Sequence, residues 1–211
     1  MKFLISAGPT REKIDPVRFL TNFSSGKMGY ALAEAAIDAG HEVVLISGPV
    51  SISPIDKAQM LYVESAEEMF EKVKSEYKDA DIIIMTAAVA DFTPVDYYEN
   101  KLKKEGRDNL TVEFKRTVDI LAYLGKKRSE NQILIGFAAE SQNLILNAKL
   151  KLNKKKTDWI IANHIGISGI GFQSNDNAVT MIAKNGTSID FGIQTKKELA
   201  QKIIKVILED E

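Results

Sequence analysis

Short, continuously apolar runs alternate along the chain with segments of helical periodicity. Such runs are typical of buried parallel strands, because helices cover both faces of a parallel sheet. The predicted strands are Phe3–Ser6, Val43–Ser47, Ile82–Thr86, Ile133–Phe137 and Trp159–Ala162. The predicted helices are Lys27–Ala39, Ala66–Tyr77, Val118–Lys127 and Gln142–Lys155. This alternation predicts an α/β fold, Rossmann-like and doubly wound, with a mostly parallel sheet and helices on both faces.

Two helix starts carry a capping box, in which a Ser or Thr is followed three residues later by Glu. Ser65 with Glu68 predicts the start of the second helix, and Thr195 with Glu198 predicts that of a C-terminal helix. We expect the C-terminal helix to dock on the core, because its apolar residues share one face. These residues are Leu199, Ile203, Val206 and Ile207.

Two segments break the alternation. Residues Phe92–Asn109 show no clear periodicity and follow the third predicted strand, at the edge of the sheet where ligands bind. We therefore expect a flexible lid over about residues 92–109. Its basic side chains are Lys101, Lys103, Lys104 and Arg107. Residues Gly166–Gly192 contain glycine turns and a small antiparallel hairpin with Asn185-Gly186 at its tip.

Length and composition restrict the class of protein. The 211 residues fit a single domain over residues 1–211, and the hydrophobic content of 45% supports a core. A net charge of −1 gives no general attraction for nucleic acid or for an acidic membrane. The lack of cysteine excludes disulfides and cysteine-ligated metals. The chain begins with a strand and contains no signal-peptide or membrane-span pattern, so we expect a cytoplasmic protein.

The segment Asn22–Gly29 is the most informative part of the chain. It joins a polar, glycine-containing loop to a predicted helix start. A helix N-terminus offers free backbone N–H groups and a positive dipole end, and glycine lets the backbone approach an anion. Thr21 and Met28 stand where a Walker A motif needs Gly and Ser or Thr, and the G-x-G-x-x-G dinucleotide fingerprint is absent too. The segment predicts a phosphate site of another type; the alternative is a loop that only caps a helix.

Small residues and one carboxylate follow the third predicted strand, in Thr86–Asp91. Small side chains let a bulky ligand group lie on the backbone. The Asp91 carboxylate could hold a sugar hydroxyl, a base amine or Mg²⁺. An N-cap or turn aspartate is an equally good interpretation.

Two arginines lie near the first strand. Arg11 and Arg18 could each clamp a phosphate or carboxylate through two parallel hydrogen bonds. Alternatively, Arg11 pairs with Glu12 or Asp15.

Further candidates follow the fourth and fifth predicted strands. Phe137 could stack on a base, although an aromatic residue at a strand end more often fills the core. Lys151 and Lys155 lie on one helix face, where they could bind phosphate or simply face solvent. Asn163 and the polar loop 171–177 would lie at the carboxyl ends of strands, where open α/β sheets bind ligands.

Taken in order, these motifs resemble those of the phosphopantothenoylcysteine synthetases, also called phosphopantothenate–cysteine ligases. The resemblance covers nearly the whole chain in the expected order. The matching segments are Ala7–Glu12, Asp15–Gly29, Ser47–Ser51, Ala87–Phe92, Lys101–Lys104, Gly136–Glu140, residues 161–163 and Gly171–Ala178.

The resemblance implies a ligation in two steps. The carboxylate of 4′-phosphopantothenate attacks the α-phosphate of CTP, with Mg²⁺, and gives an acyl-cytidylate and pyrophosphate. The amine of cysteine then attacks the acyl carbon and releases CMP. The resemblance also implies a homodimer, to which the hairpin in 166–192 could contribute. Because the chain starts at the synthetase's first strand, it resembles a stand-alone form, whose product a separate decarboxylase would use.

Carried over residue by residue, the resemblance implies Asn22 and Lys101 as catalytic residues. Lys101 would stabilise charge on the phosphoryl oxygens in the first step, and Asn22 the tetrahedral oxyanion of the second. The implied substrate contacts are Arg18, Asn22, Ala87 and Asn163. The implied nucleotide contacts are Gly8, Ser24, Ser25, Gly26, Thr86, Ala87, Asp91, Val118, Asp119, Ile120, Phe137, Lys151 and Lys155.

The resemblance implies one further role and shows one departure from the family pattern. Asp91 is also the implied Mg²⁺ contact. The segment Thr117-Val118-Asp119 departs from the family's usual Asn-Pro-Asp at the turn whose backbone contacts the cytosine. Loss of the proline predicts a less rigid loop there.

Two other functions are weaker. An NAD(P)-dependent oxidoreductase predicts the G-x-G-x-x-G turn and an acidic residue after the second strand, where Ser47-Gly48-Pro49 stands instead. A non-catalytic nucleotide sensor would leave the lysine-rich segment 92–109 unexplained. The sequence therefore favours the ligase.

Overall fold

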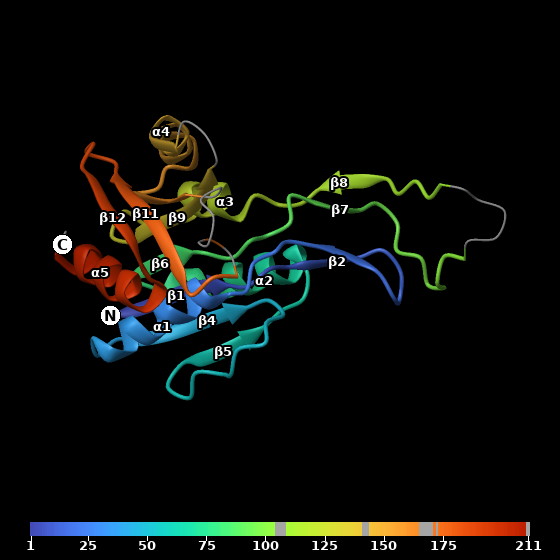
Figure 1. The fold of residues 1–211 in the computed structure, drawn as a ribbon, viewed down its shortest axis with the longest axis horizontal. Coiled ribbons are helices and arrows are strands. Elements are labelled where there is room, and N and C mark those ends of the chain that lie inside the picture. Colours follow the sequence, from blue (N-terminus) through green and yellow to red (C-terminus); the bar gives the residue numbers. More distant parts are fainter. Residues whose placement is uncertain (104–108, 141–143, 165–170, 172, 210–211) are drawn as a thin grey trace.

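A single eight-stranded sheet organises the molecule, and a long arm projects away from it (Figure 1). The computed structural model describes residues 1–103, 109–140, 144–164, 171 and 173–209. All five predicted strands are confirmed, and they lie side by side and parallel at the centre of the sheet in the order β10-β9-β6-β1-β4. Their bounds are β1 Lys2–Ala7, β4 Glu42–Ser47, β6 Ile82–Met85, β9 Ile133–Glu140 and β10 Trp159–His164.

Three further strands complete the two edges of this sheet. β5 (Gln59–Tyr62) pairs in parallel with β4 and was not predicted from the sequence. At the opposite edge, β11 (Asp176–Ala183) and β12 (Ser188–Thr195) form the predicted antiparallel hairpin. At its tip, Gly186 takes a φ of +95° and its N–H donates to the Ala183 carbonyl oxygen at 3.0 Å. Because β11 also pairs with β10, the hairpin extends the main sheet.

Helices cover both faces of the sheet, which confirms the doubly wound arrangement. α1 (Lys27–Asp38) and α5 (Lys196–Glu209) pack on one face, with α2, α3 and α4 on the other. The bounds of the latter are Ala66–Glu76, Ile120–Lys127 and Leu144–Lys155, and a short 3-10 turn, η1 (Tyr77–Asp79), follows α2. The predicted first residue of the fourth helix, Gln142, lies outside the described residues. In the described part of the chain, no helix has the length and apolar character needed to cross a bilayer.

The predicted helix starts are close to the observed ones. The hydroxyl oxygens of Ser65 and Thr195 accept hydrogen bonds from the backbone N–H groups of Glu68 and Glu198, at 3.1 and 3.2 Å. α3 starts two residues later than predicted, because the Asp119 carboxylate caps it by accepting the Ala122 N–H at 2.9 Å.

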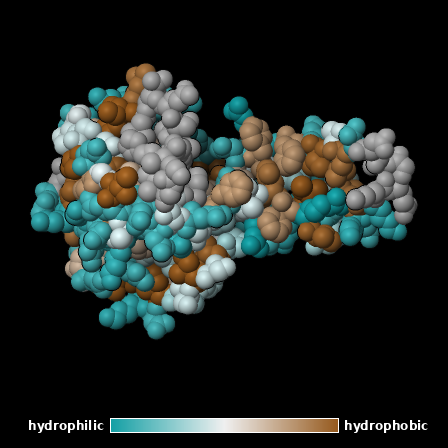
Figure 2. Space-filling model, in the orientation of Figure 1, coloured by the Kyte–Doolittle hydropathy of each residue, from teal (hydrophilic) through white to brown (hydrophobic). Residues whose placement is uncertain are grey.

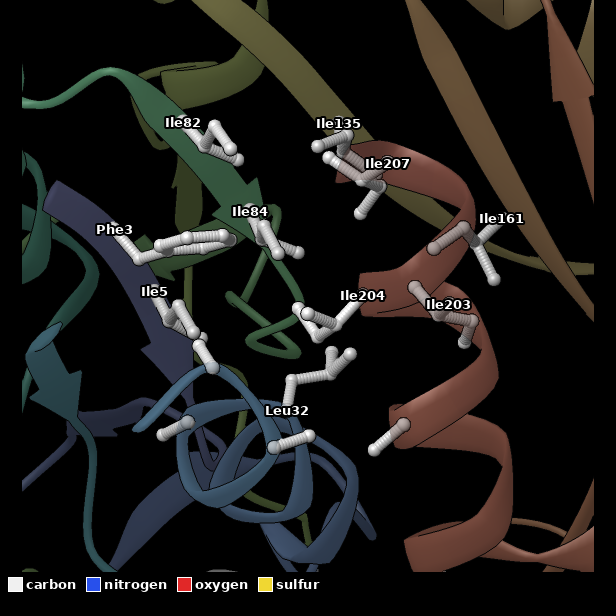
Figure 3. Close-up of a cluster of buried hydrophobic side chains, with 14 of the residues drawn as sticks. Phe3, Ile5, Leu32, Ile82, Ile84, Ile135, Ile161, Ile203, Ile204 and Ile207 are labelled. Carbon is white, nitrogen blue, oxygen red and sulfur yellow. The ribbon is translucent and has the colours of Figure 1, made fainter. Parts of the chain in front are cut away.

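The larger core lies between the sheet and the helices α1 and α5 (Figure 3). Leu32 of α1 and three isoleucines of α5 point toward the β-sheet side chains, and all are at most 2% exposed. The α5 residues are Ile203, Ile204 and Ile207. Burial of such a side chain contributes roughly 1.5–3 kcal/mol. The C-terminal helix therefore docks as its periodicity predicted, with Val206 only partly buried.

The arm consists of two short antiparallel ribbons outside the main sheet (Figure 1). One pairs β2 (Arg11–Lys13) with β3 (Phe19–Thr21), and the other pairs β7 (Phe92–Pro94) with β8 (Phe114–Arg116). The segment predicted as an irregular lid thus begins with a paired strand, a correction to that prediction. Three-residue strands are too short to show a periodicity. Lys104 and Arg107 of the predicted lid lie outside the described residues.

Candidate active site

A cavity of about 720 Å³ opens at the carboxyl ends of the central strands. Its wall includes Gly8 after β1, Thr86 after β6, Phe137 on β9 and Asn163 on β10, together with the start of α1. Open α/β sheets bind ligands at this edge. The volume lies within the range of small-molecule sites, which is roughly 300–1,000 Å³.

Two glycines shape the wall where α1 begins. Gly8 and Gly26 both have φ of +79°, a left-handed conformation that residues with a Cβ rarely adopt. A Cβ on Gly26 would also lie 2.7 Å from Cγ1 of Val50. Gly26 caps α1 without any side-chain hydrogen bond, and Lys27 and Met28 follow it in the cavity wall. The first N–H groups of a helix lack intrahelical partners, so this start is suited to an anion, and the phosphate site stays a prediction.

The segment after β6 is held by hydrogen bonds from neighbouring loops. The Ala87 N–H donates to the Ser6 hydroxyl at 3.1 Å, and the Ala88 N–H donates to the Gly8 carbonyl oxygen at 2.9 Å. Nδ2 of Asn22 donates to the Ala88 carbonyl oxygen at 2.8 Å. Asn22 is therefore fixed against this segment while its side chain stays exposed to the cavity.

Thr117 ties the loop before α3 to the same segment. Its N–H donates to the Asp91 carbonyl oxygen at 3.0 Å, and its hydroxyl donates to the Ala90 carbonyl oxygen at 2.6 Å. The sequence predicted a less rigid loop here because the family's proline is missing. These two hydrogen bonds restrain the backbone at the position just before Val118, and the lower rigidity stays a prediction.

The opposite wall carries two lysines of α4. Nζ of Lys155 forms an ion pair with the carboxylate of Asp119, and Nζ of Lys151 donates to the Phe137 carbonyl oxygen at 3.4 Å. Burial raises the pKa of Asp119, but the hydrogen bonds from Lys155 and from the Ala122 N–H outweigh burial and hold that pKa below its ordinary value. Phe137 both packs against the core and lines the cavity, so its two interpretations are compatible.

Lys27 and Lys196, at the starts of α1 and α5, hold the loop that leads into β11. Nζ of Lys27 donates to the Gln173 carbonyl oxygen at 2.9 Å and to Oδ1 of Asn175 at 2.8 Å. Nζ of Lys196 donates to the carbonyl oxygens of Gly171 and Ser174 at 2.8 and 2.7 Å. Burial and the neighbouring Lys27 lower the pKa of Lys196 to about 8.

Two buried amides face the cavity beside this loop. Asn163 is 9% exposed and Asn177 is 2% exposed, and both line the cavity. Among the residues that the structure describes, Oδ1 of each has no hydrogen-bond partner. A buried polar atom without a partner costs free energy, so these amides are suited to hydrogen bonds with a ligand.

The described lining residues carry more positive than negative charge. Five are basic and two, Asp91 and Asp119, are acidic. The basic ones are Lys27, Arg116, Lys151, Lys155 and Lys196. No group of three or more His, Asp or Glu side chains in the described ranges could hold a metal ion by itself. Mg²⁺ usually combines one or two carboxylates with substrate phosphates, and the exposed Asp91 carboxylate fits that pattern.

The structure brings most of the predicted site residues together. Those that line the cavity are Gly8, Asn22, Ser24, Ser25, Gly26, Thr86, Ala87, Asp91, Val118, Asp119, Ile120, Phe137, Lys151, Lys155 and Asn163. Arg18 and Lys101 do not line it; Arg18 lies on the arm between β2 and β3, and Lys101 lies on the arm between β7 and β8. Among the described residues no ion pair of Arg11 with Glu12 or Asp15 is found, and its guanidinium lies over the Phe19 ring, 4.7 Å from the centroid; its role as an anion clamp stays a prediction.

Sequence reasoning did not single out Arg116 or Lys196 as site residues. For Lys196 a signal was present, because a lysine in the first turn of a helix opposes the helix dipole and therefore suggests another role. Arg116 belongs to a three-residue strand, and nothing in the sequence indicated that β8 borders the cavity.

Known proteins resemble this chain over its whole length. The coenzyme A biosynthesis bifunctional protein CoaBC of Bacillus subtilis is 50% identical over 205 residues, which are 97% of this chain and 50% of that protein. The corresponding protein of Vibrio vulnificus is 43% identical over 205 residues, 97% of this chain and 51% of that protein. The crystal structure of the C-terminal domain of a CoaBC protein has a TM-score of 0.84 at 45% identity, covering 100% of this chain and 96% of that one.

The chain spans about half the length of these curated relatives. The stand-alone form expected from the sequence therefore stays a prediction. The resemblance to the synthetase domain is confirmed, because the family model of the DNA/pantothenate metabolism flavoprotein C-terminal domain matches residues 1–210. This chain belongs to the family of the DNA/pantothenate metabolism flavoprotein C-terminal domain.

Proposed function

We propose that this chain joins 4′-phosphopantothenate to L-cysteine in a CTP-dependent ligation of coenzyme A synthesis. The observation that carries the proposal is the convergence of separate synthetase motifs on one basic cavity. Asn22–Gly29, Ala87–Asp91 and Val118–Ile120 are far apart in the sequence, and all of them line it. The likeness to proteins of coenzyme A biosynthesis over nearly the whole chain supports the same pathway.

The first step forms a bond between a substrate carboxylate oxygen and the α-phosphorus of CTP. The bond from that phosphorus to pyrophosphate breaks, and an acyl-cytidylate remains. Negative charge spreads over the phosphoryl oxygens, so fixed cations and N–H groups lower the barrier. Lys151, Lys155 and the start of α1 line the cavity in positions to bind phosphates. Mg²⁺, held by the nucleotide phosphates and Asp91, would neutralise further charge.

The second step forms a bond between the cysteine nitrogen and the acyl carbon. The carbon–oxygen bond to CMP breaks, and the amine loses a proton as the amide forms. A tetrahedral oxyanion arises on the way, and a fixed neutral amide can stabilise it. The Asn22 amide has two N–H hydrogens; one is used by the Ala88 carbonyl oxygen, so the other can point at the oxyanion.

The test follows the two steps separately. The protein is incubated with CTP, Mg²⁺ and 4′-phosphopantothenate, with and without cysteine, and pyrophosphate and CMP are measured. We expect pyrophosphate in both cases, CMP only with cysteine, and much slower turnover when ATP replaces CTP. Absence of pyrophosphate with every nucleotide would exclude the ligase. Equal rates with ATP would leave the ligation but overturn the choice of CTP.

We also propose that the protein acts as a homodimer through its arm. Apolar side chains gather on the arm surface (Figure 2), and monomers rarely expose large apolar patches without a binding role. The exposed ones are Val17, Phe19, Leu20, Phe92, Val95, Tyr97, Tyr98, Leu110 and Phe114. The hairpin that the sequence predicted to contribute lies elsewhere, at the β12 edge of the main sheet, and we assign the dimer contact to the arm because of its apolar surface.

The dimer would give Arg18 and Lys101 a place in the reaction. Both lie on the arm and do not line the cavity of their own subunit. If the arm of one subunit covers the cavity of the other, these cations reach the substrates there. We expect the protein to act in the cytoplasm with small-molecule substrates only, and a decarboxylase to use its product.

A further inference from the structure

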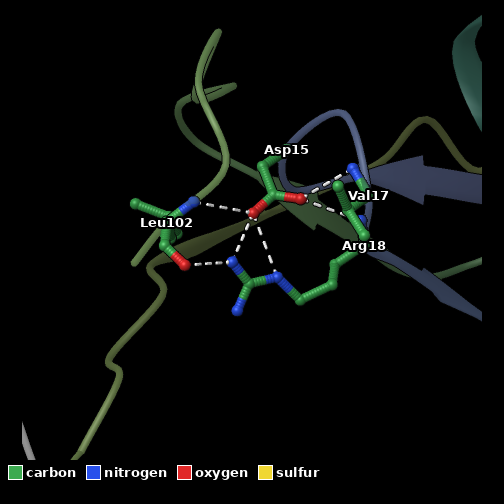
Figure 4. Close-up of polar contacts among 4 residues, drawn as sticks. All are labelled: Asp15, Val17, Arg18 and Leu102. Carbon is green, nitrogen blue, oxygen red and sulfur yellow. Dashed lines mark hydrogen bonds and ion pairs between the residues drawn. The ribbon is translucent and has the colours of Figure 1, made fainter. Parts of the chain in front are cut away.

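One buried carboxylate, that of Asp15, binds the backbone next to Lys101. Asp15 lies in the turn between β2 and β3 and is 1% exposed. Its Oδ1 accepts the N–H groups of Val17 and Arg18, at 2.9 and 2.8 Å. Its Oδ2 accepts Nε and Nη2 of Arg18, at 3.0 and 2.5 Å, and the N–H of Leu102 at 3.1 Å (Figure 4).

The contact with Leu102 joins two segments that are more than eighty residues apart. Nη2 of Arg18 also donates to the Leu102 carbonyl oxygen at 2.7 Å, so both backbone polar groups of Leu102 are held. The Leu102 N–H shares a rigid peptide plane with the carbonyl group and Cα of Lys101. Asp15 therefore fixes the backbone from which the Lys101 side chain extends. The Tyr98 N–H, which donates to the Ile14 carbonyl oxygen at 3.0 Å, adds a second tie.

The same carboxylate also orients the guanidinium of Arg18. Asp15 and Leu102 use Nε and Nη2, and among the contacts of the described residues none involves Nη1. The Arg18 side chain is 39% exposed, so part of the planar group remains open to solvent. A planar guanidinium held along one edge presents its other edge in a fixed direction.

Asp15 is suited to this role because it stays ionised. The side-chain hydrogen bonds from Arg18, with the N–H groups of Val17 and Leu102, hold the pKa of Asp15 well below its usual range despite its burial. Hydrogen bonds to an ionised group are about twice as strong as neutral ones. One carboxylate thus fixes both cations of the arm that the sequence predicted to take part in the reaction.

We propose that Asp15 is a positioning residue that holds Arg18 and Lys101 as one unit, so that the two cations meet the anionic substrates together. This inference rests on the function proposed above, since it assumes that Lys101 acts in pyrophosphate release. The alternative is that Asp15 only stabilises the fold of the arm.

A double-mutant cycle separates these alternatives. Asp15→Asn keeps the shape of the side chain but removes its charge, and Lys101→Gln removes the cation. Pyrophosphate release is measured in a single turnover without cysteine, for each variant and for both together. We expect Asp15→Asn to slow release by about tenfold or more, a barrier change of about 1.4 kcal/mol, and to have no further effect in the Lys101→Gln background. Equal slowing in both backgrounds, or none in the wild type, would overturn the proposal.

Leu102→Ala is the matched control. It removes the Leu102 side chain but keeps the N–H and carbonyl groups that Asp15 and Arg18 bind, so we expect the wild-type rate. Thermal unfolding of each variant identifies any that fail to fold.

Amide hydrogen exchange gives a second measurement that does not depend on activity. The Leu102 N–H should be protected in the wild type and in Leu102→Ala, and should exchange faster in Asp15→Asn. Unprotected exchange in the wild type would overturn the positioning role even if the ligation is confirmed. Protected exchange without any pyrophosphate release would instead contradict the proposed function and, with it, the role of Lys101.

Discussion

Single residues of this site combine a structural contact with a proposed chemical role. Asn22 donates one hydrogen to the Ala88 carbonyl oxygen and so cannot rotate freely, yet it stays exposed in the cavity. Gly26 gives α1 a start that no other residue type could form without strain, and the same start is the proposed phosphate site. The residues that shape the cavity wall are therefore also the ones that offer hydrogen-bond donors to a ligand.

Replacement of Asn22 tests its proposed role in the second step. In Asn22→Ala, the first step should proceed and the acyl-cytidylate should accumulate, because the phosphate contacts remain. Transfer to cysteine should slow by roughly 10²–10³-fold, the usual effect of a lost oxyanion donor. Quenched-flow measurements of pyrophosphate and CMP distinguish the steps. If pyrophosphate release were equally impaired, Asn22 would not be specific to the second step.

A pair of glycine substitutions separates backbone strain from steric conflict. Gly26 and Gly40 both have positive φ, but a Cβ on Gly40 would meet nothing within 4 Å, whereas one on Gly26 would meet Val50. Both Ala variants should lose about 1–2 kcal/mol of unfolding free energy from the left-handed backbone. Gly26→Ala should lose about 1–3 kcal/mol more from overpacking. Urea unfolding of the two variants gives the comparison, and equal losses would contradict it.

At the scale of elements, the sequence predicts the buried strands well and the exposed ones poorly. Ile82–Met85 is fully buried, and its continuous apolar run leaves no other interpretation. Gln59–Tyr62 escapes prediction because it is a four-residue edge strand with only partly buried and exposed positions. The strands of the arm are three residues long, and their pairing joins distant segments that no local pattern connects.

The candidate site follows the same rule. Residues at or just after the carboxyl end of a central strand, such as Asn163 and Thr86, are predictable because the carboxyl ends of parallel strands meet at one edge. Lys196 enters the cavity from the start of α5, directly after β12. Because β12 is antiparallel to β11 and β11 is antiparallel to β10, β12 runs in the same direction as the central strands and ends at the same edge. The sequence predicted roles for Arg18 and Lys101 but not their location on the arm. That location depends on strand pairing between distant segments, which no local pattern shows.

Lys196, at the start of α5, should make the free energy of unfolding depend on pH. The pKa of Lys196 is about 8 in the folded protein, against 10.5 for an ordinary lysine, because of burial and Lys27, with Asp176 acting in the opposite direction. Between these two values the unfolded chain binds more protons than the folded one, so this group makes unfolding less favourable as pH rises. Burial of the protonated Lys196 side chain thus lowers the free energy of unfolding in full below pH 8, and this loss disappears toward pH 10.5.

The measurement compares the wild type with Lys196→Met, which keeps the length of the side chain but cannot titrate. The free energy of unfolding of the wild type, relative to the variant, should rise from about pH 8 to about pH 10.5. Chemical unfolding at several pH values provides this difference. A difference that falls or stays constant over this range would show that the folded-state pKa is not lowered.

In the whole molecule, the residues with proposed roles lie partly on the main sheet and its helices and partly on the arm. The sheet and the helices supply most of the basic cavity, while the arm carries Arg18 and Lys101 and exposes apolar side chains (Figures 1 and 2). Arg18 and Lys101 do not line the cavity of their own subunit, and this placement is explained if they serve a second copy. Twofold dimers are the commonest symmetric oligomers, and in such a dimer the contact between the arm of one subunit and the cavity of the other occurs twice.

Mixing two inactive variants tests this arrangement. Lys101→Gln removes the cation of the arm, and Lys151→Gln removes a cation of the cavity; each should slow pyrophosphate release. If the arm serves the partner's cavity, a mixed dimer contains one site with both defects and one intact site. Random exchange of subunits in equal amounts makes half of the dimers mixed, so about a quarter of the wild-type activity should return. If Lys101 acts in its own subunit, every site keeps one defect and mixing restores nothing. Light scattering before and after mixing confirms that dimers are present, and a monomer at assay concentrations would overturn the arrangement directly.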